Sequence, residues 1–359
     1  MRPLVVAFVA SRAALVIVLL ASLAFIPAET CGFCVDRSAN SLLAGLSRWD
    51  GDAYIDIAQH GYEGADRASN GAYSPLYPVL VRVGGFALGG STDAYIVAGV
   101  LISNAALLFG LRSLLLLASP RIGPDGARRA ALYLLVFPTT IVLSAVYADA
   151  LFFALAVASA VETRRGRWWR SGAFAALAAL TRPFGVLAVI PLVLELWSER
   201  RQVRITTWLA AALAPLAFLG WSAYLYAISG DPLRVIHVYA AWGSAPRSPL
   251  QAFTDLFDPA IYGFPWFVLS LIVIFAALVV ASWRVTGPAL GAYATAAFLV
   301  LASSGSLTSS MRYELAIYPA FVVLGAMTAR PWAHVAWTAA SMIAALIFTA
   351  MFALWFWVG

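Results

Sequence analysis

Three aspartates gather in the polar stretch that follows the first apolar segment of the chain. Asp50, Asp52 and Asp56 lie within residues 48–62, among several aromatic side chains. An ionised carboxylate at the centre of a bilayer costs roughly 2.5 to 3.5 kcal/mol on insertion scales, so such groups are tolerated where water or partner groups satisfy them. A carboxylate beside the lipid can accept a proton from a substrate hydroxyl group. The cluster therefore indicates a site that acts on a substrate at the membrane face.

The composition defines the kind of protein that must position these acids. Hydrophobic residues make up 62% of the 359 residues, charged residues make up 11%, and the mean hydropathy is +0.86. These values exclude an ordinary soluble domain and predict a polytopic membrane protein. The 23 basic residues are all arginines, which together with frequent Ala and Gly indicates a GC-rich bacterial genome. They fall in short clusters between apolar runs, which is typical of membrane topology and not of nucleic-acid binding.

The apolar segments predict an all-α fold with about eleven transmembrane helices. Seven segments match one crossing of ~30 Å of hydrocarbon, and two longer ones are interrupted near the middle. Tyr147-Ala148-Asp149 interrupts one long segment and Thr181-Arg182-Pro183 the other, so each is expected to form a hairpin of two short spans. The single spans cover 3–26, 95–117, 206–228, 264–283, 286–304, 313–329 and 333–357, and the hairpins cover 131–162 and 171–197.

Residues 1–359 are expected to form one transmembrane domain with two sizeable loops on the same side. Arginines concentrate on the opposite side, so the positive-inside rule places the N-terminus in the cytoplasm and the loops 27–94 and 229–263 outside. The first span lacks a convincing small-x-small cleavage site and is interpreted as a helix, not a signal peptide. Cys31 and Cys34 beyond it form a lone C-x-x-C motif, which predicts a local disulfide, with free thiols as the alternative.

The first loop is expected to contain amphipathic helices that lie at the membrane surface. Apolar residues at helical spacing predict one such helix over 42–58. A second short helix is predicted to follow Pro75, over residues 76–81. Together these two helices would cover the spans like a lid.

The order of the polar motifs resembles that of a known family. Trp49-Asp50, Ile57-Ala58-Gln59-His60-Gly61-Tyr62 and Ala72-Tyr73-Ser74-Pro75-Leu76-Tyr77-Pro78 resemble the W-D…I-A-x-x-G-Y…F-x-P-x-x-P motif of the PIG-V branch of mannosyltransferases. Residues 137–152, 180–185 and 311–321 are similar to the family's two hairpin motifs and its late R-Y…P element. Phe137, Ala148-Asp149 and Ser74 depart from the family pattern, which bears on acceptor binding. The acid of the first loop and the arginine of the second hairpin are both present.

The resemblance implies a C-type glycosyltransferase (GT-C), which takes a sugar, here mannose, from a polyprenyl-phosphate carrier in the membrane lipid. The implied acceptor is an extracytoplasmic glycolipid, glycan or protein, and no cofactor or metal is expected. The leaving group is a phosphate monoester with a second pKa of about 6, so it departs without a protein acid. One carboxylate then suffices as general base for a single displacement with inversion, and such help is typically worth ~10² to 10⁴ in rate.

Asp50 is the predicted catalytic base. It is the acid of the W-D motif, and the interfacial aromatic Trp49 can anchor its height. The alternative is that Asp50 caps the amphipathic helix. Asp52 forms a D-x-D pair with Asp50, a pattern that can coordinate a divalent metal in nucleotide-sugar enzymes. Because nucleotide sugars are cytoplasmic and the predicted site is not, Asp52 is expected to be a solvated loop acid.

Substrate-binding roles are predicted for charged residues on other segments. Arg182 and Arg312 are the leading ligands of the donor phosphate and Arg247 is the third, because a planar guanidinium group matches phosphate geometry. Each arginine has an alternative role as partner of an extracytoplasmic carboxylate. Asp149, at the tip of a hairpin, is expected either to hold the acceptor sugar or to polarise Asp50, with helix capping as the alternative.

Histidine and aromatic side chains of the two loops are further candidates for the site. His60 and His237 are possible ligands or proton carriers, with a hydrogen-bonded surface histidine as the alternative. Tyr62, Tyr239 and Trp242 are possible stacking partners for a sugar ring, although an interfacial aromatic belt predicts the same residues at the same depth.

We therefore expect a multi-pass mannosyltransferase of the plasma membrane with an extracytoplasmic active site. The alternative is a transporter or flippase for a lipid-linked or polar substrate, with Arg182 and Asp149 on its pathway and the hairpins as its discontinuous helices. The absence of a visible internal repeat and the concentration of acids on one face favour the enzyme.

Overall fold

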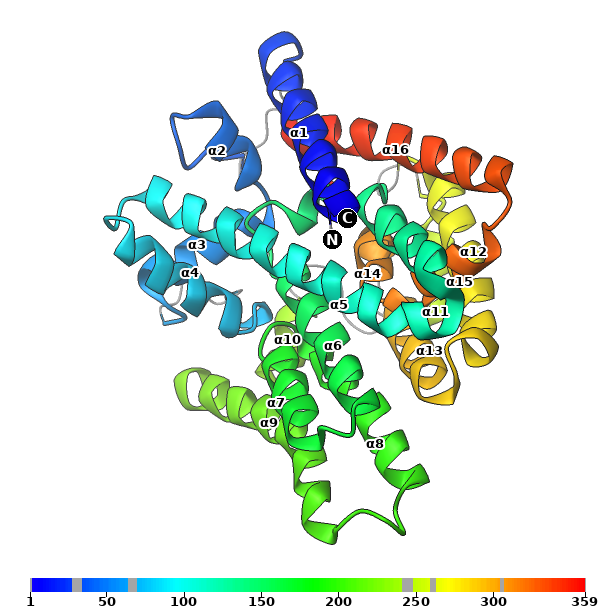
Figure 1. The fold of residues 1–359 in the computed structure, drawn as a ribbon. Helices are drawn as coiled ribbons and strands as arrows, with labels where there is room; N and C mark the ends of the chain where they lie inside the picture. Colours follow the sequence, from blue (N-terminus) through cyan, green and yellow to red (C-terminus); the bar gives the residue numbers. More distant parts are fainter. Residues whose placement is uncertain are drawn as a thin grey trace.

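The computed structural model describes residues 2–27, 34–63, 70–240, 248–258, 263–303 and 307–358 of the chain. All regular elements within these ranges are helices, as the sequence predicts. Figure 1 shows that α5 crosses the middle of the molecule, with α2, α3 and α4 at one of its ends and α6 to α9 below it. The helices long and apolar enough to cross a membrane are α1 (Arg2–Phe25), α5 (Thr92–Leu135), α9 (Leu209–Ser229) with the turn before it, α12 (Pro265–Val285) and α16 (Pro331–Ala353).

The remaining elements are shorter, and several carry or position the polar motifs. In the described part of the chain, only the five helices named above reach the length of a full crossing. The count of eleven spans therefore stays a prediction. The shorter elements are α2 (Ser41–Leu46), α3 (Asp50–His60), α4 (Leu76–Ala87), η2 (Thr140–Leu143), α6 (Asp149–Arg164), α7 (Trp168–Ala179), η3 (Pro183–Val189), α8 (Ile190–Ser198), η4 (Ile205–Trp208), α10 (Arg234–Ala240), α11 (Pro249–Asp255), α13 (Pro288–Ala302), η5 (Leu307–Ser309), α14 (Ser310–Glu314) and α15 (Tyr318–Met327).

The predicted amphipathic helix over 42–58 is wrong, because the chain turns in its middle. α2 ends at Leu46 and α3 begins at Asp50, and Trp49 between them has φ +58°. The apolar spacing continues through this turn, so the pattern alone gives no sign of it. The second helix of the loop is confirmed after Pro75, and α4 runs further than predicted, to Ala87.

The first long helical region differs from the prediction in where it breaks. Residues 92–135 form one long helical stretch with a kink at Gly123, which has φ 73° and lies between Pro120 and Pro124. The main break follows at residues 136–148, a fully buried segment that contains only the short 3₁₀ helix η2. The interruption therefore begins well before the Tyr147-Ala148-Asp149 motif, and Asp149 is the first residue of α6.

Arg12, an arginine inside the apolar helix α1, satisfies the backbone of this buried segment. Its guanidinium group donates to the carbonyl oxygen of Leu135 at 2.7 Å and to that of Thr140 at 3.3 Å. It also donates to the hydroxyl oxygens of Thr140 at 3.0 Å and Ser144 at 2.8 Å. Non-helical backbone at membrane depth persists only where protein groups satisfy it, so a long-range cation replaces the missing helical hydrogen bonds.

The second predicted hairpin is broken at the expected residues. α7 ends at Ala179, Arg182 adopts an extended conformation, and Pro183 begins the 3₁₀ helix η3 before α8 continues. Gly185 in η3 packs directly on the end of α7, where an added Cβ would lie 2.0 Å from the carbonyl oxygen of Ala178. This close return of the chain fixes the position of Arg182.

The C-terminal end of the described chain lies beside the first loop. α1 packs against α16 (Figure 1). Beyond α16, Leu354, Trp355 and Val358 are buried, with Trp355 at φ +67°. Cys34 is disulfide-bonded, as the predicted local disulfide requires, while Cys31 lies outside the described residues.

Candidate active site

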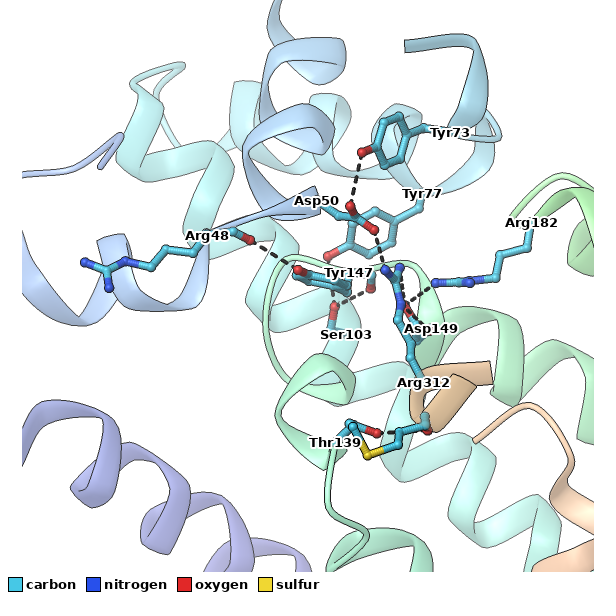
Figure 2. Close-up of polar contacts among 11 residues, drawn as sticks. Arg48, Asp50, Tyr73, Tyr77, Ser103, Thr139, Tyr147, Asp149, Arg182 and Arg312 are labelled. Atoms are coloured by element: carbon cyan, nitrogen blue, oxygen red, sulfur yellow. Dashed lines mark hydrogen bonds and ion pairs between the residues drawn. The ribbon is translucent and has the colours of Figure 1, made fainter. Parts of the chain in front are cut away.

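Asp50 points into a buried cluster of polar side chains (Figure 2). It is the first residue of α3, and the N-cap position is occupied by Trp49, which makes no capping hydrogen bond with its side chain. One carboxylate oxygen of Asp50 accepts a hydrogen bond from the Tyr73 hydroxyl group at 3.1 Å, and the other forms an ion pair with Arg312. Asp50 therefore does not serve as the cap of its helix, and its carboxylate belongs to the cluster.

Asp149 joins the same cluster from the start of α6. Its carboxylate accepts a hydrogen bond from Arg182 Nη2 at 2.6 Å, and from Arg312 Nε at 3.1 Å and Arg312 Nη2 at 3.0 Å. Ala148 occupies the N-cap position of α6, so the helix-capping alternative for Asp149 is wrong. Asp149 instead links two guanidinium groups that come from distant parts of the sequence.

Arg312 connects the two carboxylates. It lies on the short helix α14, and its guanidinium carbon stands 4.7 Å from the centre of the Tyr147 ring. α14 is fastened to the buried segment after α5 by a hydrogen bond from the Thr139 hydroxyl group to the Met311 carbonyl oxygen, at 3.0 Å. Arg312 is thus bound on three sides, by Asp50, Asp149 and an aromatic face.

Arg182 is less fully satisfied than Arg312. Its Nη2 group binds Asp149, and its guanidinium carbon lies 5.5 Å from the Phe184 ring and 5.8 Å from the Tyr313 ring. Its Nε group is buried and has no hydrogen-bond acceptor among the residues that the structure describes. A buried, unpaired donor on a cation is costly, so this group is available to an anionic ligand.

The four charges form a compact network with no net charge. Asp50, Asp149, Arg182 and Arg312 are each 9% exposed or less. Burying a lone charge costs several kcal/mol, whereas oppositely charged groups with good hydrogen bonds offset that cost. The sequence-based alternative that the arginines pair with carboxylates is therefore confirmed for Arg182 and Arg312. A guanidinium group in such a pair can also release the carboxylate and bind a phosphate instead, because both are oxyanions.

Tyr73 and Tyr147 are contacts of the cluster that the sequence did not single out as site residues. The Tyr73 hydroxyl group binds Asp50, and the Tyr147 hydroxyl group donates to the carbonyl oxygen of Arg48 at 3.3 Å. Both lie inside the motifs that resemble the family pattern. The motifs could have drawn attention to them, but sequence spacing does not show which side chains turn toward Asp50.

The other predicted site residues lie outside this network or outside the described residues. His60 Nδ1 hydrogen-bonds to Asp56 at 3.0 Å and its side chain is about half exposed, as expected for a surface histidine. The Tyr62 hydroxyl group donates to the Tyr73 carbonyl oxygen at 3.0 Å, so Tyr62 supports Tyr73 without reaching Asp50 in this structure. Arg247 and Trp242 fall within 241–247, outside the described residues.

The remaining candidates of the second loop do not join the network either. His237 is exposed and its Nδ1 hydrogen-bonds to Asp231 at 2.9 Å. Tyr239 lies in α10, and its side chain is not among those described. The sugar-stacking role of both Tyr239 and Trp242 therefore stays a prediction.

The two acids of the D-x-D pair face different partners. Asp52 forms a bidentate contact with Arg37, whose Nη2 lies 3.0 Å from the carboxylate, and the hydrogen bond to Asp52 raises the pKa of Arg37. Asp50 turns to Arg312 instead. Within the described residues, no group of three or more His, Cys, Asp or Glu side chains is placed to hold a metal ion.

The arrangement of helices is similar to that of a solved structure. The crystal structure of ArnT from Cupriavidus metallidurans bound to undecaprenyl phosphate has a TM-score of 0.53 and 14% identity to this chain. The similarity covers 96% of this chain and 75% of ArnT. At this identity the likeness shows the fold alone, which is that of a multi-pass membrane protein.

Residues 2–200 match the family model described as Mannosyltransferase (PIG-V), and the chain belongs to this family. GPI alpha-1,6-mannosyltransferase 2 of Rattus norvegicus is 35% identical over 162 residues, which are 43% of this chain and 32% of that protein. The Homo sapiens protein of the same name is 32% identical over 162 residues, with the same coverage. The match thus spans about a third of the length of these relatives. Family membership confirms the sequence resemblance and does not favour the transporter alternative.

Proposed function

We propose that the protein is a membrane mannosyltransferase that moves mannose from a polyprenyl-phosphate carrier to a hydroxyl group of an extracytoplasmic acceptor. The observation that carries the proposal is the convergence of Asp50 with Arg182 and Arg312 from three separate elements. A general base and two guanidinium groups are what transfer from a sugar phosphate requires. The family supports mannose as the sugar, and the lipid phosphate bound to ArnT supports a polyprenyl-phosphate donor.

In this proposal Asp50 is the general base. Its carboxylate accepts the proton of the acceptor hydroxyl group as that oxygen attacks the anomeric carbon from the face opposite the phosphate. The bond from the anomeric carbon to the phosphate oxygen breaks, the electron pair leaves with the polyprenyl phosphate, and the configuration at the anomeric carbon inverts. The Tyr73 hydroxyl group, 3.1 Å from one carboxylate oxygen, fixes the direction of the carboxylate.

Arg182 and Arg312 stabilise the departing phosphate. The unpaired Nε group of Arg182 supplies a donor that the protein itself does not satisfy within its described residues. Arg312 supplies a second guanidinium group, which Asp149 keeps beside the first. Preorganised cations of this kind act on the charge that develops on the leaving group, and they require no rearrangement of solvent.

Asp149 is then a positioning residue for the arginines. Its carboxylate receives hydrogen bonds from both guanidinium groups and sits at the N-terminus of α6, where the helix dipole favours a negative charge. The two sequence-based expectations, that Asp149 holds the acceptor sugar or polarises Asp50 by hydrogen bonding, stay predictions.

The ion pair between Arg312 and Asp50 defines the resting state of the site. While Arg312 binds Asp50, one oxygen of the base is occupied and cannot accept the proton of an incoming alcohol. A donor phosphate that takes over Arg312 frees this oxygen at the moment when the anomeric carbon arrives. Binding of the donor and activation of the base are thereby coupled.

The proposed topology places this site at the extracytoplasmic face of the plasma membrane. α6 begins with Asp149 and ends with Arg164, while α7 starts after Arg167 and leads to Arg182. The charged network and the arginine cluster therefore lie at opposite ends of the same helix pair, and the positive-inside rule assigns the cluster to the cytoplasm. The acceptor is a glycolipid, a glycan or a protein hydroxyl group, and the proposed chemistry uses no cofactor.

The test is transfer of radiolabelled mannose from polyprenyl-phosphate mannose in membranes that contain the protein and its native acceptors. Asp50→Asn keeps the size and hydrogen-bonding capacity of the side chain but removes the base. We expect the transfer rate to fall by roughly 10² to 10⁴. Insertion and expression are checked on the same membranes.

Asp52→Asn is the matched control. Asp52 lies two residues away on the same helix and contacts Arg37 instead of the network, so the same change there should leave transfer within about twofold of the wild type. Equal activity of the Asp50→Asn and wild-type proteins would exclude Asp50 as the base.

A further inference from the structure

The residue before Asp50 has a backbone conformation that a tryptophan rarely adopts. Trp49 has φ +58° and ψ −124°, which are the values of the first central residue of a type II′ turn, a position dominated by glycine. The carbonyl oxygen of Arg48 accepts the Gly51 N–H group at 3.1 Å, which closes this turn, and Asp52 N–H donates to the Trp49 carbonyl oxygen at 3.0 Å. A side chain with a Cβ atom is strained here, so surrounding contacts must hold it.

Trp49 contacts the segment that follows α16, near the other end of the described chain. The Trp49 ring packs edge-on against Trp355, at 5.6 Å between ring centres and 61°, and against Trp357, at 5.0 Å and 74°. Trp355 is buried and itself has φ +67°. Two aromatic rings thus enclose the strained residue.

The last residue of α16 and the same segment also hold the residue before Trp49. The guanidinium group of Arg48 donates to the carbonyl oxygen of Ala353 and lies 4.9 Å from the centre of the Trp355 ring. Asp36 binds the same guanidinium group at 2.9 and 3.0 Å. Figure 2 shows the side chain of Arg48 directed away from the network while the side chain of Asp50 points into it. On one side of the turn, Arg48 is therefore held by the C-terminal segment, and on the other side Asp50 faces the network.

We propose that Trp355 and Trp357 are positioning residues for Asp50. By holding Trp49 at positive φ they set the direction in which α3 begins, and so direct the Asp50 carboxylate toward Tyr73 and Arg312. The proposal rests on the proposed function for its catalytic readout, and it assigns a role to residues outside the matched range 2–200. A displacement of about 1 Å at a reacting group can cost ~10² in rate, so a contact that fixes this turn affects turnover without touching substrate.

The first experiment measures the kinetics of Trp357→Ala, with Trp357→Phe as the conservative variant. The Ala variant is expected to lower kcat at least tenfold with the donor KM within twofold, and the Phe variant to restore most of kcat. Trp332→Ala is the control, because Trp332 lies near the start of α16, away from this segment, and is 68% exposed. It should leave both parameters unchanged. An unchanged kcat in Trp357→Ala would overturn the proposal.

The second experiment makes the Trp357→Ala change in a Trp49→Gly protein, in which the turn needs no support from the tryptophans. Trp49→Gly adopts positive φ without strain, so the turn should form without help from the tryptophans. In the Trp49→Gly protein, adding Trp357→Ala is expected to lower kcat by less than twofold. An equal loss of kcat in both backgrounds would mean that Trp357 acts through general stability, and the positioning role would be wrong.

A readout without activity separates this proposal from the proposed function. Hydrogen exchange of the Gly51 and Asp52 amides reports the turn directly, because both amides donate within it. Exchange in a peptide spanning 48–56 is expected to accelerate at least tenfold in Trp357→Ala and to stay unchanged in Trp332→Ala. If Asp50→Asn retains transfer but exchange accelerates in Trp357→Ala as expected, Asp50 is not the base and the positioning role of the tryptophans is supported. If exchange does not accelerate in Trp357→Ala, the positioning role is wrong, whatever the activity of that variant.

Discussion

Arg312 and Asp50 form a buried ion pair although 262 positions separate them in the chain. Neither residue has another oppositely charged partner in the described network except Asp149, which Arg312 also binds. The pair joins the first loop to the helices near the other end of the sequence. It makes the base and the cation of the proposed reaction depend on each other.

The Arg312–Asp50 pair predicts an order of substrate binding. The donor phosphate must take over Arg312 before Asp50 can accept a proton, so the acceptor should bind productively after the donor. In steady-state kinetics, polyprenyl phosphate is expected to inhibit competitively against the donor and not against the acceptor. Acceptor binding that is equally strong with and without donor would contradict this order.

A guanidinium group is expected to be required at position 182. Arg182→Lys keeps one positive charge but loses the planar fork and the Nε donor, so kcat/KM for the donor should fall by roughly 10². Arg165→Lys is the control, because Arg165 is partly exposed and pairs with Glu162 at the far end of α6. Wild-type kinetics in the Arg182→Lys protein would show that charge alone suffices there.

The Tyr73 hydroxyl group is expected to contribute through the direction of Asp50. Tyr73→Phe removes one hydrogen bond to a charged group, worth about 1.5 to 3 kcal/mol, so kcat should fall about tenfold or more. Tyr62→Phe removes a hydroxyl group that donates to the Tyr73 carbonyl oxygen, and it should have a smaller effect on kcat. The reverse order of the two effects would argue that the Tyr73 hydroxyl group does not orient the base.

Gly185 should be required for the fold of the second hairpin. A methyl group at this position would lie 2.0 Å from the Ala178 carbonyl oxygen, so Gly185→Ala should cost about 1 to 3 kcal/mol or more and displace Arg182. Thermal unfolding in detergent measures the loss. Gly220→Ala in α9 is the control, because nothing lies within 4 Å of an added Cβ there. A Tm for Gly185→Ala equal to that of the control would show that the hairpin can open at no cost.

Local signals in the sequence predicted several elements correctly. The break at Thr181-Arg182-Pro183 is confirmed, because proline cannot continue a helix. The helix after Pro75 is also confirmed. It could be predicted because proline favours the start of a helix. The all-helical class was predicted from composition and from apolar segments of the length at which a helix crosses a membrane.

Other features depend on contacts between distant residues, which no local pattern shows. The turn at Trp49 interrupts an apolar spacing that looks helical, and contacts with Trp355 and Trp357 hold it. The early break after Leu135 is possible because Arg12 of another helix satisfies its carbonyl groups. The roles of Asp50, Arg182 and Arg312 were suggested by motifs, but their mutual geometry and the contact of Tyr73 required the structure.

The most direct measurement of the central claim is a structure of the protein with polyprenyl phosphate bound. We expect the phosphate to lie within hydrogen-bond distance of Arg182 Nε and Arg312, with the contact between Arg312 and Asp50 broken and the carboxylate of Asp50 facing the position of the sugar. A phosphate bound elsewhere, with the ion pair of Arg312 and Asp50 intact, would contradict the account.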